Sequence, residues 1–275
     1  MSAVSSFLRL LASEVRLIAG RRRNQAGVAV LALVPIVMAV AIRASTAPRP
    51  GRGPDFFSSI AGNGFFVALA ALAAEITLFL PLAVATLSGD AIAGEAHGGT
   101  LRYLLTVPVR RTRLLAVKYL SLVVGAAIGV AVVVLAALAA GGLLFGLGPV
   151  TLLSGTQVGL GDALGRLAVA CAYLTLQLAA LAAIGLFVST LTEQPIGATI
   201  TVTLLVMTMW ILDGIPQLDG LHPWLLVDRW SAFGDVMRDP IFWDTMATGS
   251  LVALAYTAVF LSAAWARFAG KDITS

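Results

Sequence analysis

Long apolar stretches separated by short polar segments dominate the chain. Six of them approach the roughly 20 residues that an α-helix needs to cross a hydrocarbon core of about 30 Å. They cover residues 26–42, 65–87, 119–140, 167–188, 195–212 and 247–265. The first stretch contains Pro35, which is expected to kink it. This pattern predicts an all-α integral membrane protein, residues 1–275, with six transmembrane helices in a single domain.

Residues 1–25 follow a different pattern. At 100° per residue, one face of a helix here carries four apolar side chains, Phe7, Leu11, Val15 and Ile18. We therefore expect an amphipathic interfacial helix on the inner leaflet rather than a cleavable signal peptide. Glu14 falls on the apolar face, where lipid contact is costly, so it is expected to touch protein, with Arg21 as its partner.

Residues 213–245, between the fifth and sixth stretches, are too long for a tight turn. They contain Trp224, Trp230 and Trp243, and Trp210 lies just before them. Tryptophan concentrates at the boundary between membrane and water. We therefore predict short interfacial or re-entrant helices before the last span.

The composition agrees with a membrane protein. The chain is 59% hydrophobic and 12% charged, whereas a soluble domain averages about 25% charged residues. The net charge of +4 could indicate nucleic-acid binding. However, the positive residues flank apolar stretches, which membrane topology explains better. We therefore predict that the chain contacts membrane lipids and binds no nucleic acid.

The distribution of positive charge predicts the orientation. Arginine and lysine concentrate in the amino-terminal segment, in the loop after the second stretch and in the tail, while the alternate connections carry fewer. The positive-inside rule then places both termini in the cytoplasm. Abundant alanine and an excess of arginine over lysine are typical of a GC-rich bacterium, so the predicted location is a bacterial cytoplasmic membrane.

The segment DAIAGEAHGGTLRYLLTVPVRR, residues 90–111, interrupts the apolar pattern, and its charges exclude it from lipid. Gly98 and Gly99 permit a sharp break, and Thr100 can cap a short helix that Pro108 ends. That helix would carry an i, i+3, i+4 apolar ridge, Leu101, Leu104 and Leu105. So short a helix needs a surface to pack on. The alternative is a solvated loop that only sets topology.

The run D-x-I-x-G-E-x-x-x-G-T-L-x-x-L-L-x-x-P-V-x-R extends from Asp90 to Arg111, with Lys118 behind it. With the amphipathic start, the six spans and the long outer loop, it resembles the ABC-2 type exporter permeases over nearly the whole chain. The resemblance implies the transmembrane subunit of an ATP-driven exporter. Two copies of a separate ATPase subunit would pair with a dimer of permeases, formed by a second copy or a paralogue.

The resemblance also implies a coupling segment, residues 90–108, that docks on the ATPase and transmits its closure. Glu95 would contact basic groups on the ATPase, Gly99 would make the bend, and the leucine ridge would fill a groove. His97 stands where many relatives carry a second acid, so charge pairing there is expected to be weaker or pH-sensitive. The residues assigned to ATPase coupling are Asp90, Glu95, Gly99, Thr100, Leu101, Arg102, Leu104, Leu105, Pro108 and Glu14.

The sequence offers no nucleotide site of its own. The only Gly-Lys pair, Gly270 and Lys271, is followed by Asp272 and lacks the upstream glycine of a phosphate-binding loop. We therefore expect no enzyme activity and no cofactor or metal bound by this chain, with ATP and Mg²⁺ held by the partner ATPase.

Polar residues also occur within the predicted spans. Glu75 lies near the middle of the second span, where an ionisable group indicates either function or a structural pair. Gln177 is the expected structural partner, with Thr175 and Tyr173 close by. In the family that the chain resembles, the second and fifth spans line the pathway, which implies a substrate pathway at Glu75, Thr199, Thr203 and Met207.

Three functions remain open from the sequence. The favoured one is export of a hydrophobic or amphipathic substrate, such as a drug, an antibiotic or a lipid, because no large soluble domain is evident. The alternative is a proton-coupled secondary transporter that uses Glu75. A membrane-embedded enzyme is disfavoured because neither G-x-S-x-G nor H-E-x-x-H occurs.

Overall fold

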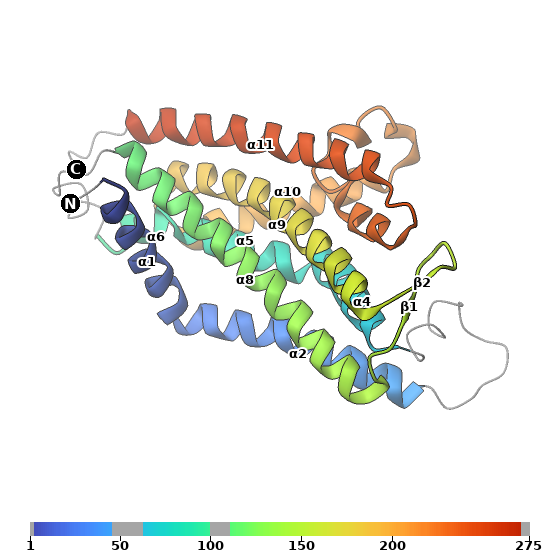
Figure 1. The fold of residues 1–275 in the computed structure, drawn as a ribbon. Coiled ribbons are helices and arrows are strands. Elements are labelled where there is room, and N and C mark those ends of the chain that lie inside the picture. The colour runs from blue at the N-terminus through green and yellow to red at the C-terminus, as the bar shows by residue number, and fades with distance from the viewer. Residues whose placement is uncertain (1–2, 46–62, 100–110, 271–275) are drawn as a thin grey trace.

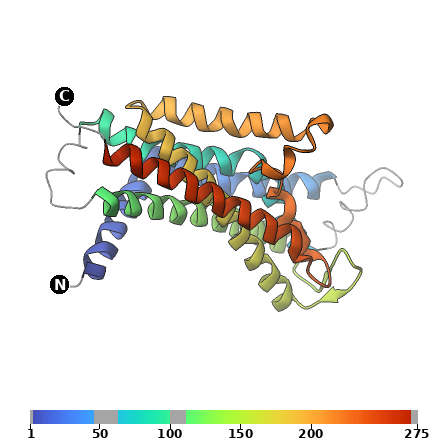
Figure 2. The ribbon, with the colours of Figure 1, turned by 90° about the horizontal axis from the view of Figure 1, so that it is seen from above.

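The structure, a computed structural model, describes residues 3–45, 63–99 and 111–270. Its long helices run side by side along the molecule (Figures 1 and 2). The α-helices are α1 (Ala3–Gly20), α2 (Arg22–Ser45), α4 (Phe65–Thr77), α5 (Phe79–Asp90), α6 (Ala93–His97), α8 (Arg111–Phe145), α9 (Leu160–Leu191), α10 (Pro195–Asp213) and α11 (Trp243–Ala269). Three 3₁₀ helices precede α11: η1 (Pro216–Leu218), η2 (His222–Trp224) and η3 (Trp230–Met237).

Five helices are each long and apolar enough to cross a membrane: α2, α8, α9, α10 and α11. Helices α4 and α5 pass the same test together, although a bend of 50° separates them. The all-α membrane architecture is therefore confirmed, with six spans when the bent pair is counted as one. The chain is a multi-pass membrane protein.

The second span is broken rather than continuous over residues 65–87. Leu78, with φ −138° and ψ −59°, separates α4 from α5. Pro81 has no backbone N–H to donate to the Thr77 carbonyl, and its ring crowds that carbonyl. Because Pro81 lies in the first turn of α5, it is tolerated there. Pro35, in contrast, lies inside α2, which continues from Arg22 to Ser45.

Helix α9 forms the centre of the bundle. It contacts α5, α8, α10 and α11, and its large side chains are fully buried at Leu174, Leu178, Leu181, Ile184 and Leu186. Helix α10 instead leaves an apolar stripe exposed, at Ile196, Ile200, Leu204, Met207 and Ile211. In a membrane protein such a stripe is suited to contact lipid or another membrane helix.

Helices α4 and α8 touch backbone to backbone at a pair of glycines. A Cβ on Gly64 would stand 2.1 Å from the Gly141 carbonyl oxygen, and one on Gly141 would stand 2.2 Å from the Gly64 oxygen. Only glycine fits at such a distance. The contact fixes the end of α8 that is farther from α1.

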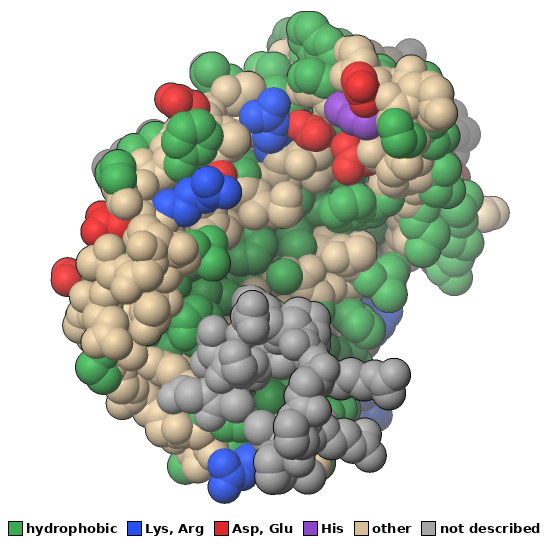
Figure 3. Space-filling model, turned by 90° about the vertical axis from the view of Figure 1, so that its right-hand side faces the viewer, with side chains coloured by type: hydrophobic (Ala, Val, Ile, Leu, Met, Phe, Trp, Pro, Cys, Tyr) green, Lys and Arg blue, Asp and Glu red, His purple; other side chains and the backbone are tan. Residues whose placement is uncertain are grey.

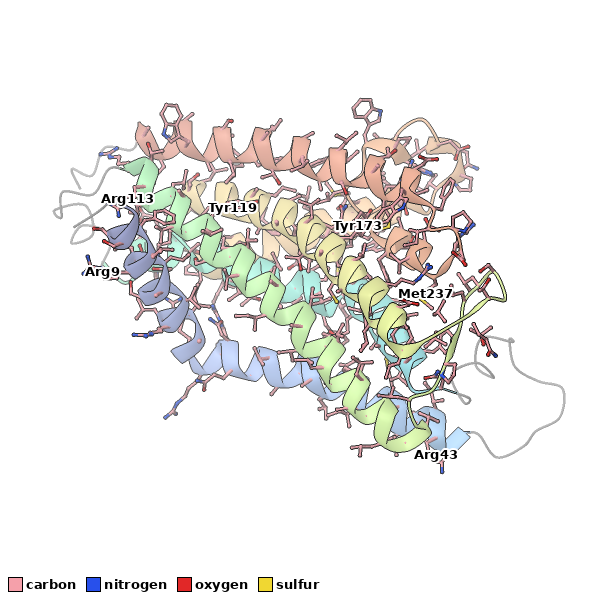
Figure 4. All side chains as sticks on the ribbon, viewed as in Figure 1. Arg9, Arg43, Arg113, Tyr119, Tyr173 and Met237 are labelled. Atoms are coloured by element: carbon pink, nitrogen blue, oxygen red, sulfur yellow. The ribbon has the colours of Figure 1, made fainter. Side chains whose placement is uncertain are left out.

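The two ends of the molecule differ. The start of α1 and the end of α11 lie at one end, together with α6 (Figure 1). At the other end, the antiparallel strands β1 (Val150–Thr151) and β2 (Gln157–Val158) form a small hairpin. Viewed from the hairpin end, charged side chains lie mainly along the upper and left edges of the molecule, with apolar side chains visible between them (Figure 3). Arg9 and Arg113 lie at the α1 end and Arg43 at the other (Figure 4).

The segment between α10 and α11 contains short helices, as predicted. However, part of this segment is buried inside the protein rather than lying at the membrane boundary. Trp224 is 71% exposed, and Trp243 is also exposed, as expected for interfacial residues. Trp230, predicted at the boundary, is instead fully buried. Its ring meets the Trp210 ring of α10 edge to face at 6.0 Å, and η3 packs on α9 and α11. Arg166 and Tyr173 of α9 donate to the Val236 and Arg229 carbonyls and hold η3 there.

Candidate functional site

The second span ends in a turn followed by a short helix. Helix α5 ends at Asp90, α6 covers Ala93–His97, and Gly99 then adopts a φ of 67°. L side chains rarely adopt that left-handed conformation, so the predicted break occurs at the glycine pair. The other residues assigned to the coupling segment lie outside the described residues: Thr100, Leu101, Arg102, Leu104, Leu105 and Pro108.

Ser189 of α9 fixes the turn between α5 and α6. Its Oγ accepts hydrogen bonds from the Ile92 and Ala93 amides at 3.1 and 2.9 Å. The same hydroxyl donates to the Gly89 carbonyl at 2.9 Å. Ser189 is fully buried, so these backbone groups have no access to water. One side chain thus joins the end of the second span to the central helix.

Lys118 of α8 binds two carboxylates from different elements. Its Nζ donates to Glu14 Oε1 of α1 at 2.7 Å and also to Glu95 of α6. The Lys118 side chain is only 4% exposed. An ammonium at such a depth requires charged partners, because desolvation without them costs several kcal/mol. The three ion-paired residues therefore tie α1, α6 and α8 together.

Asp90 forms a second charged contact at the same end. It accepts hydrogen bonds from Arg21, between α1 and α2, and from Arg23 Nη2 of α2 at 2.7 Å. The expectation that Glu14 contacts protein is met, but the predicted partner was wrong: Glu14 binds Lys118, while Arg21 binds Asp90. We call these residues the ion-pair cluster: Glu14, Arg21, Arg23, Asp90, Glu95 and Lys118.

Burial raises the pKa of the Glu95 carboxyl above its ordinary value of 4.5. The Lys118 ammonium opposes this shift, as does Arg21, whereas the Glu14 carboxylate adds to it. The pKa is raised on balance because the cost of burying the Glu95 carboxylate outweighs the attraction of Lys118 and Arg21. Protonation of Glu95 would therefore begin at a higher pH than that of a solvated glutamate.

The beginning of α8 also holds the end of α11. Arg111 Nη1 donates to the Phe268 and Ala269 carbonyls at 3.2 and 2.7 Å, which are among the carbonyls that a helix end leaves without an intrahelical partner. Trp265 Nε1 donates to Thr112 Oγ1 at 3.1 Å. The amphipathic helix α1, through Glu14 and Lys118, and the last membrane helix α11 thus both connect to α8 at this end.

Glycines bring α5 close to its neighbours just before the turn. A Cβ on Gly185 of α9 would lie 1.9 Å from Ser88 Oγ. A Cβ on Gly89 would lie 2.6 Å from Thr199 Oγ1 and 2.9 Å from the Thr199 amide nitrogen of α10. These contacts leave no space for larger side chains. The end of α5 is therefore closely packed between α9 and α10.

Glu75 lies fully buried in α4, near the break in the second span. Within the described part of the chain, neither its carboxylate oxygens nor the amide of buried Gln177 has a hydrogen-bond partner. The predicted bond between them is therefore absent. Tyr173 bonds to the Arg229 carbonyl and Thr175 to the Cys171 carbonyl instead.

The predicted pathway residues of α10 lie in different surroundings. Thr199 is half-buried against α5, and its hydroxyl donates to the Pro195 carbonyl at 3.0 Å. Thr203 donates to the Thr199 carbonyl at 2.9 Å. Met207 belongs to the exposed apolar stripe. Glu75 lies on α4, before the break in the second span. The structure therefore does not bring Glu75, Thr199, Thr203 and Met207 together in one chamber. Their role in a substrate pathway stays a prediction.

Several site residues escape the sequence analysis. Lys118 gives a signal, because a lone lysine lies at the start of an apolar stretch, but no pattern identifies its two partners. The sequence gives no signal that Ser189 matters, since serine is common in membrane helices. Pro81 gives a clear helix-breaking signal. Only the three-dimensional arrangement shows that charges 104 residues apart, Glu14 and Lys118, meet.

Comparison with known protein families gives a match to this chain. The sequence model described as "ABC-2 family transporter protein" matches residues 18–221, which is most of the chain. The matched region begins near the end of α1 and includes the broken span, the turn between α5 and α6, and all of α8, α9 and α10. A search of curated proteins finds no match.

Proposed function

Because the chain belongs to the ABC-2 family of transporter proteins, we propose that it is the membrane subunit of an ATP-driven exporter whose ATPase docks on residues 90–108. Membership of the family itself establishes a permease subunit and implies an ABC ATPase as partner. The direction of transport, the substrate class and the docking segment are our proposal.

The arrangement at the end of the second span carries this proposal. The segment that leads into residues 100–108 is bound to α9 through Ser189, to α8 and α1 through Glu95 and Lys118, and to α2 through Asp90. A solvated loop that only sets topology has no need for buried ion pairs. A segment that must transmit a displacement into several membrane helices does.

The role of Glu95 follows from its contact. Its carboxylate binds Lys118 within the chain, so we assign it first to holding α6 on α8 and α1. Contact with basic groups of the ATPase, as the family resemblance implies, stays a prediction. The apolar ridge of Leu101, Leu104 and Leu105 then supplies the main docking surface on the ATPase.

The assembly consists of two permeases and two ATPase subunits in a bacterial cytoplasmic membrane, with both termini in the cytoplasm. The second permease is a copy of this chain or a paralogue. The substrate is a hydrophobic or amphipathic molecule. Several half-buried or exposed polar and polarisable side chains of α10 support this choice, at Thr199, Thr203 and Met207.

Purification of the tagged full-length chain from its native membranes in mild detergent tests the docking. Mass spectrometry should identify an ATPase with a phosphate-binding loop. Leu104→Glu should abolish its retention, since a carboxylate replaces an apolar contact. Leu153→Glu, at an exposed leucine of the hairpin end, should retain it. Absence of any ATPase, or its full retention by Leu104→Glu, would contradict the proposed docking.

Reconstituted vesicles distinguish the two transport mechanisms. ATP-dependent movement of an amphipathic dye should survive a protonophore if ATP drives transport. Loss of transport with the protonophore would instead favour the secondary transporter. In that case Glu75, buried without a hydrogen-bond partner in the described residues, is the coupling group, and Glu75→Gln should stop transport while the protein still assembles.

A further inference from the structure

A groove of about 590 Å³ lies between α1, α2, α5 and α8. Most of its lining is aliphatic, as at Val28, Leu31, Leu80, Val84 and Ile128. Val28 and Ile128 are exposed, so the groove opens to the surroundings of the bundle. Because three of its helices cross the membrane, that opening lies at the level of the hydrocarbon. Its volume falls within the range of roughly 300–1,000 Å³ that is usual for small-molecule sites.

The groove has one polar end. Arg23, Asn24 and Gln25 line it at the beginning of α2, beside Val15, Ile18 and Ala19 of α1. From Gly27 onward, the α2 residues that line it are apolar or lack a side chain. The lining therefore changes from charged to aliphatic along α2, which suits a ligand with a polar head and a hydrocarbon tail.

The charge at that end is positive. Arg21 and Arg23 share the single carboxylate of Asp90, and their side chains remain 45% and 48% exposed. Arg22 is exposed between them in the sequence. Two guanidinium groups thus share one carboxylate, which leaves an excess of positive charge, and Arg22 adds a further positive charge to the beginning of α2. Guanidinium groups bind phosphate oxygens through paired hydrogen bonds.

Asn24 supplies a further polar group. Its Nδ2 donates to the Ile18 carbonyl at 2.8 Å, whereas its Oδ1 is buried and has no hydrogen-bond partner among the described residues. A buried acceptor without a donor costs free energy. A hydroxyl group at the polar end of the groove would satisfy it.

We propose that the groove binds one acyl chain of an anionic phospholipid from the leaflet next to α1. The lipid phosphate lies at Arg23, and a headgroup hydroxyl donates to Asn24 Oδ1. The aliphatic lining and the opening toward hydrocarbon select a lipid tail, and the arginines select a negative headgroup. This lipid site does not depend on the proposed direction of transport, and it contacts every helix that the ion-pair cluster joins except α6.

Native mass spectrometry of the delipidated full-length chain, titrated with phosphatidylglycerol or phosphatidylcholine, tests the site. We expect one phosphatidylglycerol to bind in preference to phosphatidylcholine, by about fivefold for each arginine that contacts the phosphate. Ala83→Phe, at a half-buried position in the groove wall, should remove this binding. Ala255→Phe, at an exposed position of α11 outside the groove, is the matched control and should not.

The headgroup contact has its own variants. Arg23→Gln should lower the affinity for phosphatidylglycerol about fivefold, and Arg23→Lys should keep most of it. Equal binding of the two lipids would overturn the assignment of an anionic lipid. Unchanged phosphatidylglycerol affinity in Ala83→Phe, with a melting temperature like that of Ala255→Phe, would overturn the groove as the site.

Discussion

Lys118 is a buried ammonium that two carboxylates share. Its removal leaves Glu14 and Glu95 half-buried without their cation, whereas replacement of all three charges leaves a neutral contact. Breaking a buried ion pair typically costs about 3–5 kcal/mol, while replacing the whole group by neutral residues is often tolerated. The contribution of each of these three charged side chains to stability therefore depends on the presence of the other two.

Lys118→Met is therefore expected to lower the free energy of unfolding by about 3–5 kcal/mol. The triple variant Glu14→Gln, Lys118→Met, Glu95→Gln should recover most of that loss. Thermal melting in detergent measures both. Arg238→Met serves as control, because its pair with Asp235 has a 59% exposed side chain and should change stability by at most about 1 kcal/mol. Equal losses in Lys118→Met and Arg238→Met would contradict the buried cluster.

The raised pKa of Glu95 predicts a pH dependence. The folded protein holds the Glu95 proton more tightly than the unfolded chain, so this residue's contribution to stability is fully present below pH 4.5 and is lost as the pH rises through the folded-state pKa. Glu95→Gln cannot ionise and should remove this loss. Melting temperatures measured from below pH 4.5 upward should fall more in wild type than in Glu95→Gln. Parallel profiles would show that Glu95 does not titrate in this way.

Among elements, α9 gives the other helices their positions. It reaches the turn after α5 through Ser189, approaches α5 closely at Gly185, and holds η3 through Arg166. Small residues permit these approaches, and single polar groups then fix them. Such contacts are expected between helices in a membrane, because the hydrophobic effect does not drive helices together within lipid.

Ser189→Ala should weaken the turn between α5 and α6. Two buried amides and one carbonyl lose their partner, which is expected to cost about 1–3 kcal/mol. Hydrogen exchange at Ile92 and Ala93 should accelerate. Ser250→Ala is the matched control, since among the described residues its hydroxyl bonds only to the Met246 carbonyl of its own helix. Unchanged exchange at Ile92 would mean that another contact holds the turn.

Gly185→Ala and Gly165→Ala make a matched pair on α9. At Gly185 the added methyl would meet Ser88 Oγ at 1.9 Å and Ser88 Cβ at 2.6 Å, whereas at Gly165 no atom of the described residues lies within 4 Å. We expect Gly185→Ala to destabilise by about 1–3 kcal/mol or more and Gly165→Ala to be neutral or stabilising by up to about 1 kcal/mol. Melting temperatures test both. Addition of Ser88→Gly should partly rescue Gly185→Ala, and its failure to do so would argue against this contact.

The sequence predicts elements better than contacts. Hydrophobic stretches locate the spans because lipid requires an apolar helix surface, and the glycine pair locates the break after α6. The bend at Leu78 was missed although Pro81 signals it. The partners of Lys118 could not be predicted, since Glu14 and Glu95 belong to elements whose packing depends on the whole bundle. For the same reason Trp230 was placed at the interface, while η3 buries it.

The whole molecule has two distinct ends, and its orientation can be tested directly. Cys171 is the only cysteine, so Cys171→Ala gives a background for single labels. Ser13, exposed on α1, and Ser154, exposed in the hairpin, mark the two ends. In intact cells, an impermeant maleimide should label Ser154→Cys, whereas Ser13→Cys should require permeabilisation. The reverse result would invert the proposed topology.

If helix α8 moves as a rigid rod, its contact with Gly64 near one end is the pivot. Its 35 residues extend about 52 Å, and the backbone contact between Gly64 and Gly141 fixes a point roughly 35 Å from Lys118. A displacement of 1 Å at Lys118 then corresponds to a rotation of only about 1.6° over that arm. Such a rotation would produce a graded displacement, largest at the ion-pair cluster, smaller beside the groove and nearly zero at the glycine contact. A small push at one end thus reaches the groove while the hairpin end stays still.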